Sequence, residues 1–314
     1  MNYSGLAEAI LTIIIFTGIG FFSAKAGLFK KSDTKAFSNL IFYITSPALI
    51  LSSVTEHFTR EMVLSSLAVP VFAVIMTILS LIAAYAAQKI IKLDNPSKKD
   101  IFYLAVSFCN TVFIGLPIVT SVYGESAAGF VFFYDLGSGI VLWTLGIELA
   151  CRGRDSDKNG LGRFLKNLIN PSSLALALAV FLVMLKVPLP DVISSTAKTL
   201  GSITVPLSML FIGMSVGHSR ISAGMLDPLV FWAAFIRLII SPMLTGAAVY
   251  FAPVPTILKK VVTVEAAMPV MMFTAILADR YKKNSEFASR AVLVTTFISM
   301  VTIPAIVYVL ELIY

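Results

Sequence analysis

Long apolar stretches separated by short polar connections run along the whole chain. A helix needs about 20 apolar residues to cross the roughly 30 Å of hydrocarbon in a bilayer. The pattern therefore predicts an all-α polytopic membrane protein with ten transmembrane helices. Their approximate limits are residues 5–27, 34–55, 63–90, 100–122, 126–150, 172–187, 193–217, 228–251, 256–279 and 288–313.

The composition supports this assignment and excludes several classes of protein. Of the 314 residues, 58% are hydrophobic and only 13% are charged, which rules out a soluble domain. The first apolar segment, Ile10–Phe22, has no basic residue before it and no cleavage site after it, so we interpret it as a retained helix. Cys109 and Cys151 are interpreted as packing residues. Because no nucleophile is paired with a base and no metal-ligand spacing occurs, neither an enzyme nor a metal site is expected.

The basic residues predict how the helices are oriented. The formal net charge is +7, but Lys and Arg occur in short runs between apolar segments, so nucleic-acid binding is not expected. Eighteen of the 24 basic residues fall in connections on one side of the membrane and five on the other, with Arg237 inside a span. The richer side is cytoplasmic by the positive-inside rule. We therefore expect a multi-pass protein of the cell membrane with both termini extracellular.

Two pairs of motifs indicate an internal repeat. Ile44–Leu51 and Ile203–Leu210 share the pattern Ile-Thr-x-Pro-x-x-x-Leu at an offset of 159 residues. Tyr123 and Tyr281, each followed by a short polar turn, are 158 residues apart. A duplicated unit of five helices places its two copies in opposite orientations, as in many secondary carriers. The expected parts are a first repeat (1–151), a cytoplasmic linker (152–171) and a second, inverted repeat (172–314).

The stretch Cys109–Gly124 is poorly explained by ordinary packing in a membrane. It places an amide, hydroxyls, glycines and a proline inside an apolar segment, and irregular backbone survives there only when it is buried in protein or lines an aqueous cavity. We therefore predict two broken helices, unwound near Asn110–Gly115 and Ala267–Met271, with Pro117 and Pro269 as helix-break elements. The repeat aligns Thr111 with Pro269. Half-helix N-termini exposed at such breaks attract carboxylates.

These residues resemble a known family. Cys109–Pro117 is similar to the signature Gly-Asn-Thr-Gly-Phe-Leu-Gly-Leu-Pro of the auxin efflux carriers, with Cys109 and Val112 in place of glycines. The second-half signature is similar to Ala266–Pro269 followed by Thr295. The resemblance extends over essentially the whole chain and includes the bacterial members described as permeases for malonate or related organic anions.

The resemblance implies a fold, a mechanism and a partner. The fold is that of the bile acid sodium symporters, with spans four and nine broken and crossing at mid-membrane. Spans one, two, six and seven form a scaffold, the other six form a mobile transport domain, and the protein is usually a homodimer. Plant members carry a long central loop and two charged residues in span three. Here the loop is short and Val63–Ala87 has no charge, which argues against auxin as the substrate and leaves the coupling scheme open.

The candidate substrate site combines polar groups near the breaks with charges inside the spans. Glu265 could bind sodium or a proton, or form a structural bridge with Arg237. Asp135, beside small residues that allow close helix approach, could be a protonation or cation site. Arg237 could balance an anionic substrate, or snorkel, or pair with a carboxylate. The full set of candidates is Asn110, Thr111, Gly115, Pro117, Asp135, Ser138, Arg237, Glu265 and Pro269.

The function expected from these features is secondary active transport of a small organic anion, such as a mono- or dicarboxylate, by elevator-type alternating access. No cofactor is expected apart from sodium or proton coupling. Two alternatives stay open, namely a sodium-coupled symporter of the bile acid type and a membrane sensor that does not transport.

Overall fold

The structure is a computed structural model that describes residues 3–93, 95–152, 169–218 and 227–314. Regular structure in these ranges is helical, apart from one isolated antiparallel bridge between Cys109 and Val270. Most of the predicted linker, residues 153–168, lies outside the described part. Within the described residues, six helical stretches are long and apolar enough to cross a membrane. They are Ser32–His57, Arg60–Ile91, Glu125–Cys151, Asp191–Gly217, Pro228–Tyr250 and Ser285–Ile313.

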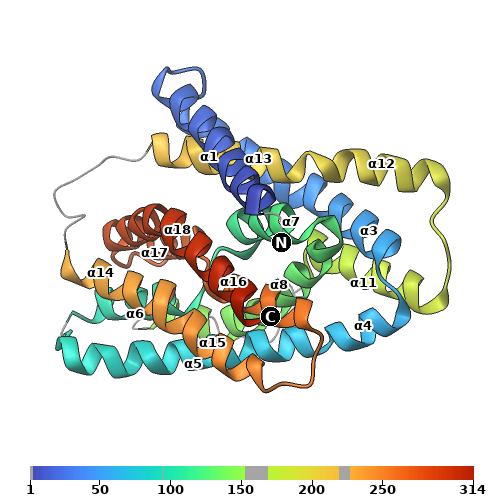
Figure 1. The fold of residues 1–314 in the computed structure, drawn as a ribbon. Helices are drawn as coiled ribbons and strands as arrows, with labels where there is room; N and C mark the ends of the chain where they lie inside the picture. The colour runs from blue at the N-terminus through green and yellow to red at the C-terminus, as the bar shows by residue number, and fades with distance from the viewer. Residues whose placement is uncertain (1–2, 94, 153–168, 219–226) are drawn as a thin grey trace. The chain divides into compact units, whose positions relative to one another are not determined.

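The helices follow the predicted apolar segments to within a few residues (Figure 1). In the first half they are α1 (Tyr3–Lys25), α2 (Lys31–Leu40), η1 (Ile41–Thr45), α3 (Ser46–His57), α4 (Arg60–Ser66), α5 (Ala68–Ile91), α6 (Pro96–Ser107), η2 (Thr111–Gly115), α7 (Leu116–Tyr123), η3 (Glu125–Ala127), α8 (Ala128–Val141), η4 (Leu142–Gly146) and α9 (Ile147–Cys151). In the second half they are α11 (Pro171–Leu185), α12 (Asp191–Ser202), α13 (Thr204–Gly217), α14 (Pro228–Phe235), η6 (Ile236–Ile240), α15 (Ser241–Tyr250), α16 (Thr256–Ala266), α17 (Phe273–Arg280) and α18 (Ser285–Ile313).

Prolines inside the apolar segments are accommodated by wider turns. The π-helical turns η1, η2 and η6 end two residues before Pro47, Pro117 and Pro242, respectively. A proline inside an α-helix has no N–H to donate, and its ring collides with the carbonyl one turn earlier. A wider turn before the proline moves that carbonyl away, and the proline then falls in the first turn of the next helix. The chain thus continues as a helix through each of these prolines.

The chain divides into two compact units that are not contiguous in sequence. Unit 1 comprises Met1–Leu67, Val112–Phe133 and Ile169–Arg220. Unit 2 comprises Ala68–Thr111, Tyr134–Leu168 and Ile221–Tyr314. Unit 1 contains the four spans that the resemblance assigns to a scaffold, but it also takes α7 and the first part of α8. The division between the units therefore passes through η2 and α8. The resemblance had predicted that spans four and five belong entirely to the transport domain.

Unit 1 is held together by close helix contacts at glycines. A side chain at Gly213 of α13 would collide with the backbone of Thr17 and Phe21 in α1, so these two helices pack backbone against backbone. In Figure 1, α1 crosses over α13. Helix α3 lies between α11 and α12, and its Leu49 backbone touches Gly201.

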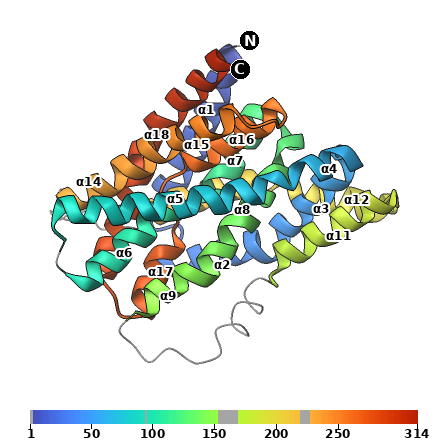
Figure 2. The same cartoon turned by 90° about the horizontal axis from the view of Figure 1, so that it is seen from below.

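Unit 2 has an apolar core made by several helices. Its largest fully buried core side chains include Phe102 on α6 and Phe287 on α18, and they pack with residues of α5, α9, α14 and α17. Helix α16 packs along α15, and both contact α5, as Figure 2 shows. The core thus includes residues of α6 and α17, the helices that lie directly before the first non-helical segment and directly after the second, 108–110 and 267–272.

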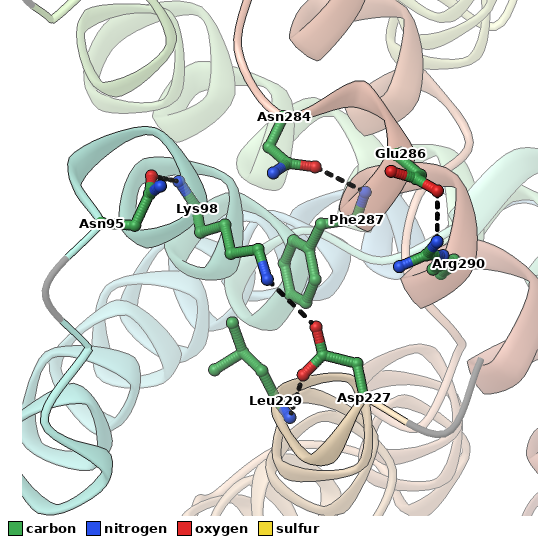
Figure 3. Close-up of polar contacts among 8 residues, drawn as sticks. All are labelled: Asn95, Lys98, Asp227, Leu229, Asn284, Glu286, Phe287 and Arg290. Carbon is green, nitrogen blue, oxygen red and sulfur yellow. Dashed lines mark hydrogen bonds and ion pairs between the residues drawn. The ribbon is translucent and has the colours of Figure 1, made fainter. Parts of the chain in front are cut away.

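One end of unit 2 gathers the starts of three helices (Figure 3). The side chains of Asn95, Asp227 and Asn284 each accept a hydrogen bond from a backbone N–H group in the first turn of α6, α14 and α18, respectively. Lys98 Nζ lies 3.2 Å from Asp227 Oδ2 and so joins α6 to α14. Glu286 and Arg290 form an ion pair one turn apart on α18. Caps of this kind stabilise a helix end by about 1 kcal/mol each.

A buried ion pair lies at the same end of unit 2. Asp100 of α6 is 2% exposed, and its Oδ2 accepts a hydrogen bond of 2.6 Å from Lys283 Nζ. Lys283 also donates to the carbonyl of Arg152 at 2.7 Å, while Arg152 Nη1 lies 3.8 Å from Asp100 Oδ1. The cluster joins α6 to the end of α9 and to the connection between α17 and α18. The charge distribution assigns three of these basic residues to one side of the membrane, namely Lys98, Arg152 and Lys283. In the structure all three lie at the same end of unit 2.

Candidate functional site: the helix crossing

Two helices of unit 2 are broken, and the breaks meet. Helix α6 ends at Ser107 and α16 ends at Ala266. The backbone N–H of Asn110 donates to the carbonyl of Pro269 at 2.9 Å, and that of Met271 donates to the carbonyl of Phe108 at 3.1 Å. We call the two non-helical segments, 108–110 and 267–272, the helix crossing. Their mutual hydrogen bonds satisfy backbone groups that neither helix could satisfy alone.

The first break lies upstream of its predicted place, whereas the second lies where it was predicted. The chain was expected to unwind over Asn110–Gly115, but it leaves the helix at residues 108–110 and then forms the π-helical turn η2. Pro117 is therefore not a break element, because it sits in the first turn of α7, where its missing N–H is harmless. Pro269 lies inside the second break.

Arg237 caps the ends of both broken helices. The side chain is 1% exposed and is carried by the turn η6. Its Nη2 donates to the carbonyl of Ala266 at 2.6 Å and its Nε to that of Met268 at 3.1 Å. Its Nη1 donates to Val106 at 3.1 Å and, more weakly, to Ser107 at 3.4 Å. One guanidinium thus satisfies the terminal carbonyls of α6 and α16, which carry partial negative charge.

Glu265 is a buried carboxylate beside the helix crossing. It lies beside Ala266 at the end of α16, is 0% exposed, and has no hydrogen-bond partner for either carboxylate oxygen among the described residues. The structural bridge to Arg237 that was considered from the sequence is not formed, because the guanidinium donates to carbonyls instead. A carboxylate in this position is available for a ligand.

Unpaired donors accompany this carboxylate in unit 2. Asn110 is 2% exposed, and its side-chain Nδ2 has no hydrogen-bond partner in the described part of the chain. The hydroxyls of Ser107 and Thr274, each next to a break, are also buried and without a partner there. A buried donor left without a partner costs about 1–3 kcal/mol. Such groups are suited to a ligand that supplies acceptors.

Asp135 belongs to the same unit and is hydrogen-bonded to Thr111, the residue that follows the first break. Thr111 Oγ1 donates to Asp135 Oδ1 at 2.5 Å, and Ser138 Oγ donates weakly to the carbonyl of Asp135 at 3.3 Å. Of the neighbouring glycines, Gly137 permits the close approach expected, because a side chain there would collide with the backbone of Pro70 in α5. Gly139 has no such close neighbour.

Most of the candidate residues belong to one compact unit, and two belong to the other. Asn110, Thr111, Asp135, Ser138, Arg237, Glu265 and Pro269 all belong to unit 2. Gly115 and Pro117 follow the first break along the chain, in η2 and α7, and belong to unit 1. Their part in binding remains a prediction.

Thr295 is a contributor to the crossing that sequence reasoning did not single out. Its Oγ1 accepts a hydrogen bond from the backbone N–H of Val270 at 3.1 Å and donates to the carbonyl of Ala291 at 2.7 Å. It therefore anchors the second break to α18. In the sequence, the feature that could have pointed to it is the pair Thr295 and Thr296 inside an apolar segment, of which Thr295 was used only as part of the family signature.

Comparison with known proteins gives a consistent result. A family model described as "Membrane transport protein" matches residues 6–307. An uncharacterized transporter from Methanocaldococcus jannaschii is 27% identical over 304 residues, which is 94% of this chain and 96% of the relative. Another from Methanothermobacter thermautotrophicus is 23% identical over 97% of this chain and 98% of its own length. A third from Escherichia coli is 20% identical over 97% of each chain.

The match of the family model covers nearly the whole chain, including both halves of the crossing. The relatives are likewise matched over almost their full lengths, and each is named as a transporter. Together with the apolar helices, these findings describe a multi-pass membrane protein. The chain belongs to the auxin efflux carrier family of membrane transport proteins.

Proposed function

We propose that the protein is a secondary active transporter that moves a small organic anion, such as a mono- or dicarboxylate, across the cytoplasmic membrane. The observation that carries this proposal is the helix crossing, with its buried, unpaired Asn110 amide. A carboxylate substrate would accept the hydrogen bonds that Asn110, Ser107 and Thr274 do not make within the described residues. The positive N-terminal ends of the half-helices that restart after each break add attraction for an anion.

The proposed mechanism is elevator-type alternating access by a homodimer with ten spans per chain. The two breaks begin 159 residues apart, which is the offset of the repeated proline motif and supports an inverted repeat. The separation of the chain into two compact units supports a mechanism in which one body moves and the other is fixed. Arg237 serves in this mechanism as a support of the site, because its donors are engaged by carbonyls.

The test is transport by the purified protein in liposomes. Uptake or counterflow of labelled mono- and dicarboxylates is expected for at least one member of a broad panel. Parallel assays with a sodium gradient and with bile acids address the symporter alternative. Uptake that needs sodium and selects bile acids would replace the proposal with that alternative, and a complete absence of flux would favour the sensor.

The site is tested separately by binding. Ligand that binds only the folded protein raises its apparent melting temperature with concentration. We expect a carboxylate that stabilises the wild type to lose at least tenfold in affinity for Asn110→Ala, because about 1.4 kcal/mol corresponds to tenfold. Asn39→Ala, at an exposed position on α2, is the matched control and is expected to bind like the wild type. Equal affinities of the two variants would remove Asn110 from the site.

A further inference from the structure

The Glu265 carboxylate is a charge that the contacts of unit 2 leave without compensation. Both oxygens are buried, and the described residues offer them no hydrogen bond and no ion pair. Arg237, the cation that interacts electrostatically with Glu265, donates its hydrogen bonds to carbonyls at or just beyond the ends of α6 and α16 instead. A carboxylate that is buried in ionised form without a partner is strongly destabilised, because it loses its hydration. Glu265 therefore needs a cation or a proton from solution.

The charged groups around Glu265 can be counted for every element that packs against α16. Helix α15 contributes no Asp, Glu, Lys or Arg. On α16 itself, Lys260 pairs with Glu311 of α18 at 2.6 Å, and Lys259 donates to the carbonyl of Tyr250. The groups that interact electrostatically with Glu265 are Arg237, Asp135, Cys109 and Tyr134. The remaining charged groups on packed elements are Lys89 of α5, over the Tyr85 ring, and the Glu286–Arg290 pair of α18.

The net charge of the site follows from these groups. With both carboxylates ionised, Arg237, Asp135 and Glu265 sum to one negative charge, and an anionic substrate would add at least one more. Like charges held close together in a low-dielectric site repel each other strongly. A proton on Glu265 removes the excess charge and needs no ligand besides the carboxylate itself.

We propose, on the basis of the function proposed above, that Glu265 takes up one proton when the organic anion binds and releases it when the anion leaves. The protein is then a symporter of an organic anion and a proton. On the side of the membrane where the anion enters, a proton leaves water and forms an O–H bond with one oxygen of Glu265. It returns to water on the other side, so each cycle moves one proton with one anion.

The proposal predicts a specific pH dependence of binding. Because the anion and the proton bind together, the affinity for the anion should fall as the pH rises. The fall should be about tenfold for each pH unit, over the range where Glu265 is ionised in the free protein and protonated in the complex. The probes are malonate, succinate, acetate and lactate, measured by thermal shift and calorimetry at pH values where each probe stays fully ionised. A pH dye in weakly buffered solution should report one proton taken up for each molecule bound.

Variants distinguish Glu265 from other groups that titrate. Glu265→Gln should lose the pH dependence and the proton uptake, whereas Glu265→Asp should retain both. Glu148→Gln is the matched control, since Glu148 is an exposed glutamate on α9 of the same unit, and should behave like the wild type. If Glu265→Gln does not fold, the dye measurement on the wild type and the aspartate variant still decide the question.

The possible results separate the two proposals. Wild-type binding that is independent of pH and without proton uptake overturns the symport inference while leaving carboxylate transport intact. Binding that follows sodium instead of pH, and loses this dependence in Glu265→Gln, also overturns it in favour of a sodium site. A wild type that binds none of the probes and transports no carboxylate overturns both.

Discussion

At the scale of single residues, Arg237 joins the ends of the two broken helices of unit 2. A buried arginine in a membrane span commonly signals an ion pair or an anionic ligand. Here the guanidinium donates four hydrogen bonds to carbonyls from two segments distant in sequence. Its planar array of donors suits this arrangement, because it reaches several acceptors at once where an ammonium group would act as a point charge.

We predict that Arg237→Lys destabilises the protein although it keeps the charge. Losing two or more charge-assisted hydrogen bonds to buried carbonyls should cost about 3 kcal/mol or more. The apparent Tm of the purified protein in detergent should therefore fall by several degrees. Arg60→Lys, at an exposed position on α4, is the control and should leave the Tm unchanged. A Tm of Arg237→Lys equal to that of the wild type would show that the four carbonyls do not depend on the guanidinium.

At the scale of helices, glycine allows contacts that larger residues would prevent. Gly213 of α13 faces the backbone of α1, whereas Gly18 of α1 has no atom within 4 Å of the position where a side chain would begin. Both residues lie in helix interiors, so the intrinsic preference of the helix for alanine is the same at both sites. Their surroundings alone differ.

Alanine should therefore have opposite effects at these two glycines. Gly213→Ala is expected to lower the stability by about 1–3 kcal/mol, because the methyl group must push α1 and α13 apart. Gly18→Ala is expected to raise it by about 0.5–1 kcal/mol through reduced backbone freedom in the unfolded chain. Thermal unfolding of the two variants beside the wild type measures both signs. Equal effects would mean that α1 and α13 do not pack at Gly213.

The limits of sequence-based prediction are also clearest for the helices. The apolar runs located the helices well, since the cost of burying backbone in lipid leaves little freedom. The second break was placed correctly at Ala267, but the first was expected over Asn110–Gly115, whereas the chain is non-helical at 108–110 and forms a π-helical turn from Thr111. The role of Arg237 could not be derived, because its acceptors include Val106, which is 131 residues away in sequence. Contacts of that kind depend on tertiary packing that hydropathy does not encode.

At the scale of the whole molecule, the distribution of Lys and Arg predicts the orientation in the membrane. In a protein whose native cysteines, Cys109 and Cys151, are buried, a single added cysteine can report its side of the membrane. An impermeant maleimide should label Arg60→Cys in intact cells, but should label Lys92→Cys only after the membrane is opened. Both positions are exposed. The reverse labelling pattern would show that both termini face the cytoplasm.

The bonds of the helix crossing also have a mechanical consequence. Breaks in membrane helices are natural hinges, because unwound backbone bends at low cost. In this protein the two breaks are hydrogen-bonded to each other, to Thr295 and, at Met268, to Arg237, so bending either one would disrupt several buried contacts. The crossing should accordingly behave as a stiff joint that carries its polar groups as one piece. The flexibility needed for a transport cycle must then reside elsewhere in the chain, and the breaks themselves should be among its least mobile parts.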